Sequence, residues 1–549
     1  MTVDGASDAA VPEPAARQQT DPQTHPRRAQ PDDHVSHSSH SSPDSRDRQD
    51  GEGGRANLGR RVRRGLVFSL LNNVVGRLGT IVAGIVLARL LVPADFGVFA
   101  VALVALSAVL SMNELGASLA LVRWPGDPRR IAPTVTTISL GTSAVLYLIC
   151  LAGSGPFASA MGSPEATGVV RLLCVSVLID AVTATPAALL TRDFRQGQRL
   201  AVDLSSFALS TGLTVALAAG GYGAWSLAWG RLAGNLLSAA LLFWLAAIWP
   251  RPGFDRTQFR ELLSFGLPLA GASLLLFGML NVDYLVVGPL LGPVALGLYL
   301  QAFNLSSWPV NMFSTAVRRV SLAAFSRLQD DPVALTSALA RSTALLAAAT
   351  LPVCVLLGLL AHPAVTVVYG QRWAGSAAAL QFLAVLGLAR VLTELLYDFL
   401  VAVGRGGATM VLQGLWLVAL LPTLTVGAHL DGIRGVALAH ALVAVCLVIP
   451  VFCATVARTG VPWHPWLAPL GRPLVGTALL VAAVVAVRSV TEPGFVQLVT
   501  GGLAGVAVYL PVVAPMRHLV RGGVIGVPQD GAGGTGRDAD GTTRSATAM

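Results

Sequence analysis

Long apolar runs separated by short polar breaks fill the chain from about residue 65 to residue 516. A helix needs about 20 apolar residues to cross the hydrocarbon core of a bilayer, and many of these runs reach that length. The pattern predicts an all-α polytopic membrane protein with about 14 transmembrane helices, and a count of twelve is the open alternative. The expected helices begin near Leu66, Phe96, Ile131, Thr167, Leu200, Ala224, Leu262, Val294, Leu335, Gly375, Ala408, Gly435, Pro473 and Val496.

The two ends of the chain differ from this pattern. Residues 1–60 are rich in Ser, Asp, Pro, Gln, His and Arg and contain almost no large apolar side chains. Such a segment cannot bury enough apolar surface to offset the entropy that it would lose on ordering. We therefore expect a disordered cytoplasmic tail at 1–60 and a second one at 522–549, which is rich in Gly, Thr and Asp.

The positions of the arginines orient the predicted helices. Cytoplasmic loops of membrane proteins carry an excess of basic residues. If both termini are cytoplasmic, 15 loop arginines fall on the inner side and four on the outer side, at Arg89, Arg372, Arg434 and Arg488. The sequence therefore predicts a multi-pass protein with both termini in the cytoplasm.

A short pattern recurs at an offset of 200 residues. Leu90–Pro93 followed by Gly97 matches Leu290–Pro293 followed by Gly297, and each stretch lies between the first and second helices of a predicted six-helix set. Halves with an even number of helices share one orientation and are related by an axis along the membrane normal. The alternative is a chance match between Leu- and Gly-rich segments. The pattern predicts two six-helix lobes around a central cavity, at 61–255 and 256–458, and two additional helices in 459–521.

Three stretches carry a family resemblance: Leu87–Gly97, Asn281–Gly288 with Leu296–Ala302, and Ala324–Asp331. They resemble segments of the Wzx-type O-antigen, colanic-acid and teichuronic-acid exporters. These are polysaccharide transporters of the multidrug/oligosaccharidyl-lipid/polysaccharide superfamily. The resemblance covers roughly residues 60–458 and implies a location in the cytoplasmic (inner) membrane of a bacterium. The long N-terminal tail and the two additional C-terminal helices depart from the common pattern, and lipid II flippases of the superfamily also have fourteen helices.

The composition argues against a soluble enzyme. The chain is 54% hydrophobic and only 12% charged, whereas soluble domains carry about 25% charged residues. All 38 basic residues are arginine, which excludes a Walker A lysine and a Schiff-base nucleophile. The five cysteines lack the spacing of a metal site. We expect no enzyme activity, no catalytic residue, no metal and no cofactor. The net charge of +9 belongs to the membrane body and its loops, so no nucleic-acid partner is expected.

Several arginines fall inside predicted helices. Ionisable residues at membrane depth usually face the interior of the bundle or a water-filled cavity. Arg77 follows Asn73 by one turn and Arg231 precedes Asn235 by one turn, so each pair shares a helix face. With Arg390, these residues are the expected cationic head-group site, because guanidinium groups bind phosphate oxygens in pairs. The alternatives are interhelical ion pairs, or side chains that extend to the membrane interface.

Acidic residues inside the predicted helices are candidates for ion coupling. Arg390, Glu394 and Asp398 recur every four residues on one helix face, and Asp283 lies in the seventh predicted helix. A buried carboxylate can carry a proton, so Asp283, Glu394 and Asp398 are the expected coupling residues. For the three residues on one face, a structural ion network is the competing interpretation.

The resemblance implies a flippase that moves an undecaprenyl-pyrophosphate-linked oligosaccharide across the cytoplasmic membrane, for cell-surface polysaccharide synthesis. It would work by alternating access coupled to an ion gradient. A lipid II flippase and a multidrug or cation antiporter of the same superfamily are the alternatives, and a membrane polysaccharide polymerase is a third. Expected partners are the lipid-linked oligosaccharide, the bilayer, and polysaccharide polymerase or assembly proteins.

Overall fold

Every regular element in the described part of the chain is a helix. The computed structural model describes residues 76, 79–113, 128–192, 196–246 and 253–516. The predicted tails at 1–60 and 522–549 therefore lie outside the described residues, as do Asn73 and Arg77. The predicted all-α polytopic class is confirmed.

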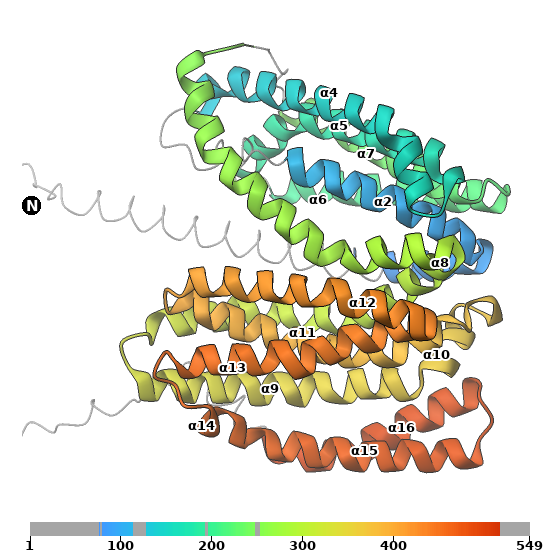
Figure 1. Ribbon diagram of the computed structural model, residues 1–549, viewed down its shortest axis with the longest axis vertical. Helices are drawn as coiled ribbons and strands as arrows, with labels where there is room; N and C mark the ends of the chain where they lie inside the picture. Colours follow the sequence, from blue (N-terminus) through green and yellow to red (C-terminus); the bar gives the residue numbers. More distant parts are fainter. Residues whose placement is uncertain (1–75, 77–78, 114–127, 193–195, 247–252, 517–549) are drawn as a thin grey trace, which may run out of the picture. The chain divides into compact units, whose positions relative to one another are not determined.

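Five helices before residue 250 contact one another. Helix α5 contacts α2, α4 and α7, and α6 packs on α7 (Figure 1). All five are long and apolar, which suits burial in a bilayer better than in water. Their bounds are α2 (Pro93–Asn113), α4 (Pro128–Ala160), α5 (Thr167–Arg192), α6 (Gln196–Ala219) and α7 (Ala224–Ala246).

A second set of mutually packed helices follows residue 330. Helix α11 contacts α9 and α12, and the hairpin of α15 and α16 lies against α9. The two additional helices expected near the C-terminus correspond to this hairpin. The bounds are α9 (Pro332–Leu359), α10 (Ala361–Val368), α11 (Ser376–Ala402), α12 (Gly406–Val443), α13 (Ile449–Ala457), α14 (Trp463–Leu467), α15 (Gly471–Val490) and α16 (Phe495–Val513).

Helix α8 (Arg256–Arg327) contacts both sets, with α2 and α4 on one side and α9, α11 and α12 on the other. It is broken at Gly292, where φ is 80°, a left-handed value that glycine adopts without a steric penalty. Helix α12 has a similar break at Asp431 and Gly432, where the φ of Gly432 is 54°. The two breaks coincide with the predicted boundaries before Val294 and Gly435.

Ten helical stretches of the described residues are long and apolar enough to cross a membrane. Two of these, 273–311 and 406–457, contain the breaks and so hold two helices each. The described residues also contain helix α7 and the short apolar helix Gly79–Leu90, which are not among these ten. The number of spans, fourteen or twelve, stays a prediction. The lobe boundaries at 61–255 and 256–458, and the central cavity between the lobes, stay predictions.

The two repeated stretches pack against each other where α2 meets α8. A Cβ atom on Gly97 would overlap the carbonyl oxygen of Pro293, and a Cβ atom on Gly297 would overlap the carbonyl oxygen of Pro93. The contact is reciprocal, as in an interface that a two-fold axis relates to itself. The repeat therefore has a structural counterpart, a close crossing of backbones that requires glycine at both positions.

Hydrogen bonds between residues 88–91 and residues 367–373 hold the same junction. The indole nitrogen of Trp373 donates a hydrogen bond of 2.7 Å to the Ala88 carbonyl, and the Trp373 ring packs edge-on against Phe96 at 5.0 Å. Arg89 donates to the carbonyls of Val367 and Val368. Arg372 donates to the carbonyl of Leu91. Arg89 and Arg372 thus lie at the same end of the bundle, as the predicted topology requires.

Candidate functional site

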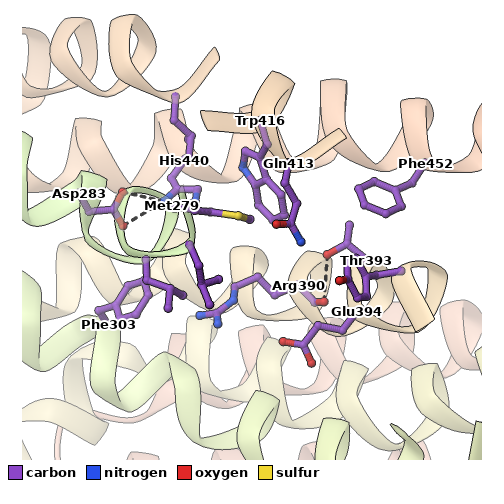
Figure 2. A pocket seen from close by; sticks show the side chains of 14 residues that line it. Met279, Asp283, Phe303, Arg390, Thr393, Glu394, Gln413, Trp416, His440 and Phe452 are labelled. Carbon is purple, nitrogen blue, oxygen red and sulfur yellow. Dashed lines mark hydrogen bonds and ion pairs between the residues drawn. The ribbon is translucent and has the colours of Figure 1, made fainter. Parts of the chain in front are cut away.

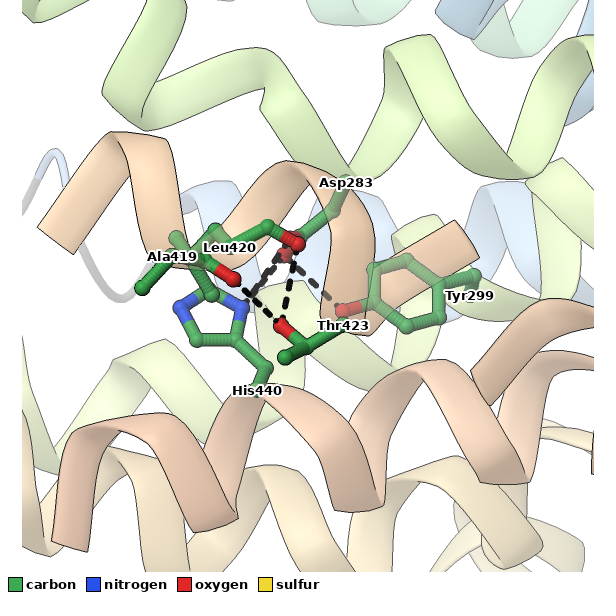
Figure 3. Close-up of polar contacts among 6 residues, drawn as sticks. All are labelled: Asp283, Tyr299, Ala419, Leu420, Thr423 and His440. Atoms are coloured by element: carbon green, nitrogen blue, oxygen red, sulfur yellow. Dashed lines mark hydrogen bonds and ion pairs between the residues drawn. The ribbon is translucent and has the colours of Figure 1, made fainter. Parts of the chain in front are cut away.

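Asp283 forms a buried polar cluster with two residues that are distant in sequence. The carboxylate is 4% exposed. The Tyr299 hydroxyl donates to Oδ2 at 2.9 Å, and Nδ1 of His440 lies 3.0 Å from each carboxylate oxygen (Figure 3). Tyr299 and His440 are buried as well. A carboxylate surrounded by apolar helices is stable only when it is paired and hydrogen-bonded, and both conditions are met here.

The cluster joins three helical segments. Asp283 precedes the break of α8 at Gly292 and Tyr299 follows it, while His440 follows the break in α12. The cluster therefore links the segments on both sides of the α8 break to the segment that follows the α12 break.

A cavity of about 270 Å³ adjoins the cluster. It is lined by residues from both parts of α8, from α11, from α12 and from α13 (Figure 2). Asp283 and His440 form one end of its lining. The polar residues along the rest of the lining are Arg390, Thr393, Glu394, Tyr397, Gln413 and Trp416, and the apolar ones are Leu276, Met279, Leu280, Phe303, Leu420 and Phe452.

Arg390 projects from α11 into this cavity. Its guanidinium carbon lies 5.6 Å from the centre of the Phe303 ring, a cation–π contact. Within the residues that the structure describes, it forms no ion pair with Glu394, which lines the same cavity one turn further along α11. Asp398, a further turn on, is 2% exposed and does not belong to the cavity lining. The structure therefore brings together Asp283, Arg390 and Glu394 of the predicted residues.

Arg231 and Asn235 lie elsewhere, on α7. Arg231 is exposed on the surface of its helix and Asn235 is half-buried. The side chains of Arg231 and Asp180, on α5, attract each other electrostatically across the contact between their helices. Arg231 and Arg390 therefore do not line one described cavity, and a joint head-group role for them stays a prediction.

Arg231 and Asp180 are expected to be energetically coupled. Arg231→Gln should lower the melting temperature in detergent, because Asp180 loses the positive charge that attracts it. Adding Asp180→Asn should recover part of the loss, with a coupling of at most about 1 kcal/mol, because the two side chains attract each other electrostatically without forming a described ion pair. Thermal unfolding of the two single variants and the double variant measures it. Strict additivity would contradict the pairing.

Six polar residues of the site had not been predicted from the sequence: Tyr299, Thr393, Tyr397, Gln413, Trp416 and His440. Two of them carried a usable signal. His440 is an isolated histidine in an otherwise apolar run, and Trp416 lies inside such a run, whereas most of the other tryptophans lie near predicted helix ends. The pairing of Asp283 with His440, 157 residues further along, had no local signal.

The family relationship is clear from the sequence. Residues 86–378, more than half of the chain, match the family described as polysaccharide biosynthesis protein. The succinoglycan biosynthesis transport protein ExoT of Rhizobium meliloti is 25% identical over 78% of this chain and 87% of its own length. The lipopolysaccharide biosynthesis protein WzxC of Escherichia coli is 22% identical over 65% and 73%. The teichuronic acid biosynthesis protein TuaB of Bacillus subtilis is 24% identical over 56% and 66%.

Solved structures share the fold. The lipid II flippase MurJ in an inward closed conformation has a TM-score of 0.69 at 15% identity, covering 83% of this chain and 100% of that one. An inward-facing multidrug transporter of the MATE family has a TM-score of 0.55 at 18% identity, covering 70% and 94%. At these identities the likeness shows the fold alone. The chain belongs to the polysaccharide biosynthesis protein family, and it is a multi-pass bacterial membrane transporter of the Wzx type.

Proposed function

We propose that this protein is a flippase that moves an undecaprenyl-pyrophosphate-linked oligosaccharide from the inner to the outer leaflet of the cytoplasmic membrane. The oligosaccharide would then serve cell-surface polysaccharide synthesis. The observation that carries the proposal is the polar cavity between apolar helices, with the buried Asp283–His440 pair in its wall. The relatives' names, which refer to transport and to surface polysaccharides, support the same function.

Transport by this protein is driven by a proton gradient in this proposal, with Asp283 and His440 as the coupling site. The ionisable groups that face the pair are Tyr299 and Tyr284 from α8 and Arg390 from α11. Of the three acidic residues expected to couple ions, Asp283 has a basic partner at hydrogen-bond distance. Glu394 lies in the same cavity and is the second candidate.

Alternating access is the mechanism that fits two long helices, α8 and α12, that are each broken into two segments. The breaks at Gly292 and at Gly432 allow the segments on either side to reorient, and the Asp283 cluster spans both breaks. A ligand shifts such an equilibrium only by the difference of its affinities for the two states. The protonated and deprotonated forms of the cluster supply that difference here. Both termini are proposed to be cytoplasmic, with polysaccharide polymerase and assembly proteins as partners.

The pyrophosphate of the substrate is proposed to contact arginines. Arg231 with Asn235, and Arg77 with Asn73, are the candidates among the N-terminal helices, and Arg390 is the candidate in the described cavity. Guanidinium groups hold phosphate oxygens in a bidentate geometry, which makes arginine better suited than a simple point charge.

Depletion of the protein tests the proposed function. Polyprenyl-linked glycans extracted from depleted cells and identified by mass spectrometry are expected to include an accumulated multi-sugar undecaprenyl-pyrophosphate intermediate. Re-expression of the wild-type chain should clear it. Accumulation of lipid II would move the assignment to a lipid II flippase. An unchanged lipid-linked pool would contradict both and favour a soluble-substrate antiporter.

A further inference from the structure

The cavity beside Asp283 contains an unsatisfied hydrogen-bond donor. Trp416 is 5% exposed, and its indole nitrogen has no hydrogen-bond partner among the described residues. A buried donor left without an acceptor costs about 1–3 kcal/mol. Trp416 packs edge-on against His440, with ring centres 6.3 Å apart, so its position is fixed by neighbours. An indole held in this way is suited to donate to a bound molecule.

Further polar groups line the same cavity. Gln413 lies one turn before Trp416 on α12, and Arg390, Thr393 and Glu394 come from α11 (Figure 2). The Arg390 guanidinium contacts the face of Phe303 and forms no ion pair with described residues, so its N–H groups are free of carboxylates there. The lining therefore offers amide, guanidinium and indole donors together with carboxylate and amide acceptors, and the rest of the lining is apolar.

This mixture of groups favours one class of ligand. A polyprenyl chain would leave Arg390, Glu394 and Gln413 without partners. A pyrophosphate that contacts Arg390 would also lie close to the carboxylates of Asp283 and Glu394, which repel it, so the rest of the cavity suits an uncharged part of the substrate. An uncharged ring with several hydroxyl groups can accept from Trp416, exchange hydrogen bonds with the amide and the charged groups, and place its apolar face on an aromatic ring. The volume of about 270 Å³ lies at the lower end of small-molecule sites, which suits a single ring.

We propose that this cavity is a saccharide subsite that binds one sugar ring of the transported glycan, with Trp416 and Gln413 as specificity-determining contacts. Its role in transport rests on the proposed flippase function, but binding of a free sugar there does not. The subsite places the glycan next to the Asp283–His440 pair. A sugar bound in the cavity would therefore lie beside the side chains that carry the proton in the proposed function.

Free glycosides test the subsite directly. The full chain, purified in detergent, is examined by saturation-transfer NMR with methyl glycosides of glucose, galactose, mannose and N-acetylglucosamine. At least one of these is expected to bind the wild-type chain at millimolar concentration. Trp416→Phe keeps the aromatic face but removes the N–H donor, so it should weaken binding about tenfold. Gln413→Ala should weaken binding to a similar extent.

Trp463→Phe is the matched control, because Trp463 is 59% exposed and does not line the cavity. It should leave glycoside binding unchanged. Equal melting temperatures show that the variants are folded. Binding that is absent in the wild type, or equal in the wild type and Trp416→Phe, overturns the subsite. Binding that depends on Trp416 in a protein whose depletion leaves lipid-linked glycans unchanged keeps the subsite and overturns the flippase function.

Discussion

Asp283→Asn is expected to abolish the response of transport to a pH gradient. In vesicles containing the purified protein, a gradient of one pH unit supplies about 1.4 kcal/mol per proton, or up to about tenfold accumulation of a polyprenyl-pyrophosphate glycan in the favoured leaflet. The variant should show the same leaflet distribution with and without the gradient. The physical reason is that asparagine keeps a hydrogen bond to Tyr299 but cannot exchange a proton with His440.

Two further variants separate coupling from folding. Asp330→Asn is the matched control, since Asp330 is exposed in a connector, and it should keep the full response. His440→Ala should also lose the response, and it should unfold more readily by about 3–5 kcal/mol, because it leaves the Asp283 carboxylate buried without its partner. A folded Asp283→Asn protein that still responds fully to the pH gradient would rule out this coupling site.

Gly297→Val is expected to destabilise the protein strongly and to stop transport. Any Cβ at this position overlaps the carbonyl oxygen of Pro93, and the backbone cannot move away as the end of a side chain can. Overpacking in cores costs about 1–3 kcal/mol, and a backbone clash lies at or above the upper value. Gly97→Val should have the same effect, because its Cβ meets Pro293 in the reciprocal contact. Thermal unfolding in detergent measures both.

A glycine outside the crossing provides the control. Gly141, within α4, has no heavy atom within 4 Å of an added Cβ. Gly141→Ala should leave the melting temperature unchanged or raise it, because alanine favours a helix by about 1 kcal/mol over glycine. If Gly297→Val and Gly141→Ala melt alike, the tight crossing of α2 and α8 does not contribute to stability as inferred.

The repeat was recognisable in the sequence, but its role in tertiary packing was not. The match at an offset of 200 residues indicated two related halves. It did not reveal that the two copies touch each other, which makes Gly97 and Gly297 mutually dependent. Similarly, the sequence predicted a helix start near Val294, whereas the left-handed geometry of the break at Gly292 came from the structure.

The candidate site was only partly predictable. Asp283, Arg390 and Glu394 stood out as charges in apolar runs, because burying an ion in a membrane is costly and therefore unusual. His440 and Trp416 carry no obligatory charge and fit an apolar run without conflict. Arg231, also conspicuous as a charge, lies on α7 near Asp180 and not in the described cavity.

The sequence alone determined the membrane class, the approximate helix boundaries and the family. Each of these depends on local features, namely the length of apolar runs, the placement of arginines and short motifs. Only the tertiary structure decided which residues meet, such as Asp283 with His440 and Gly97 with Pro293. Nearly uniform apolar helices do not record in their sequence which face will be buried against which neighbour. That choice follows from packing between segments more than a hundred residues apart.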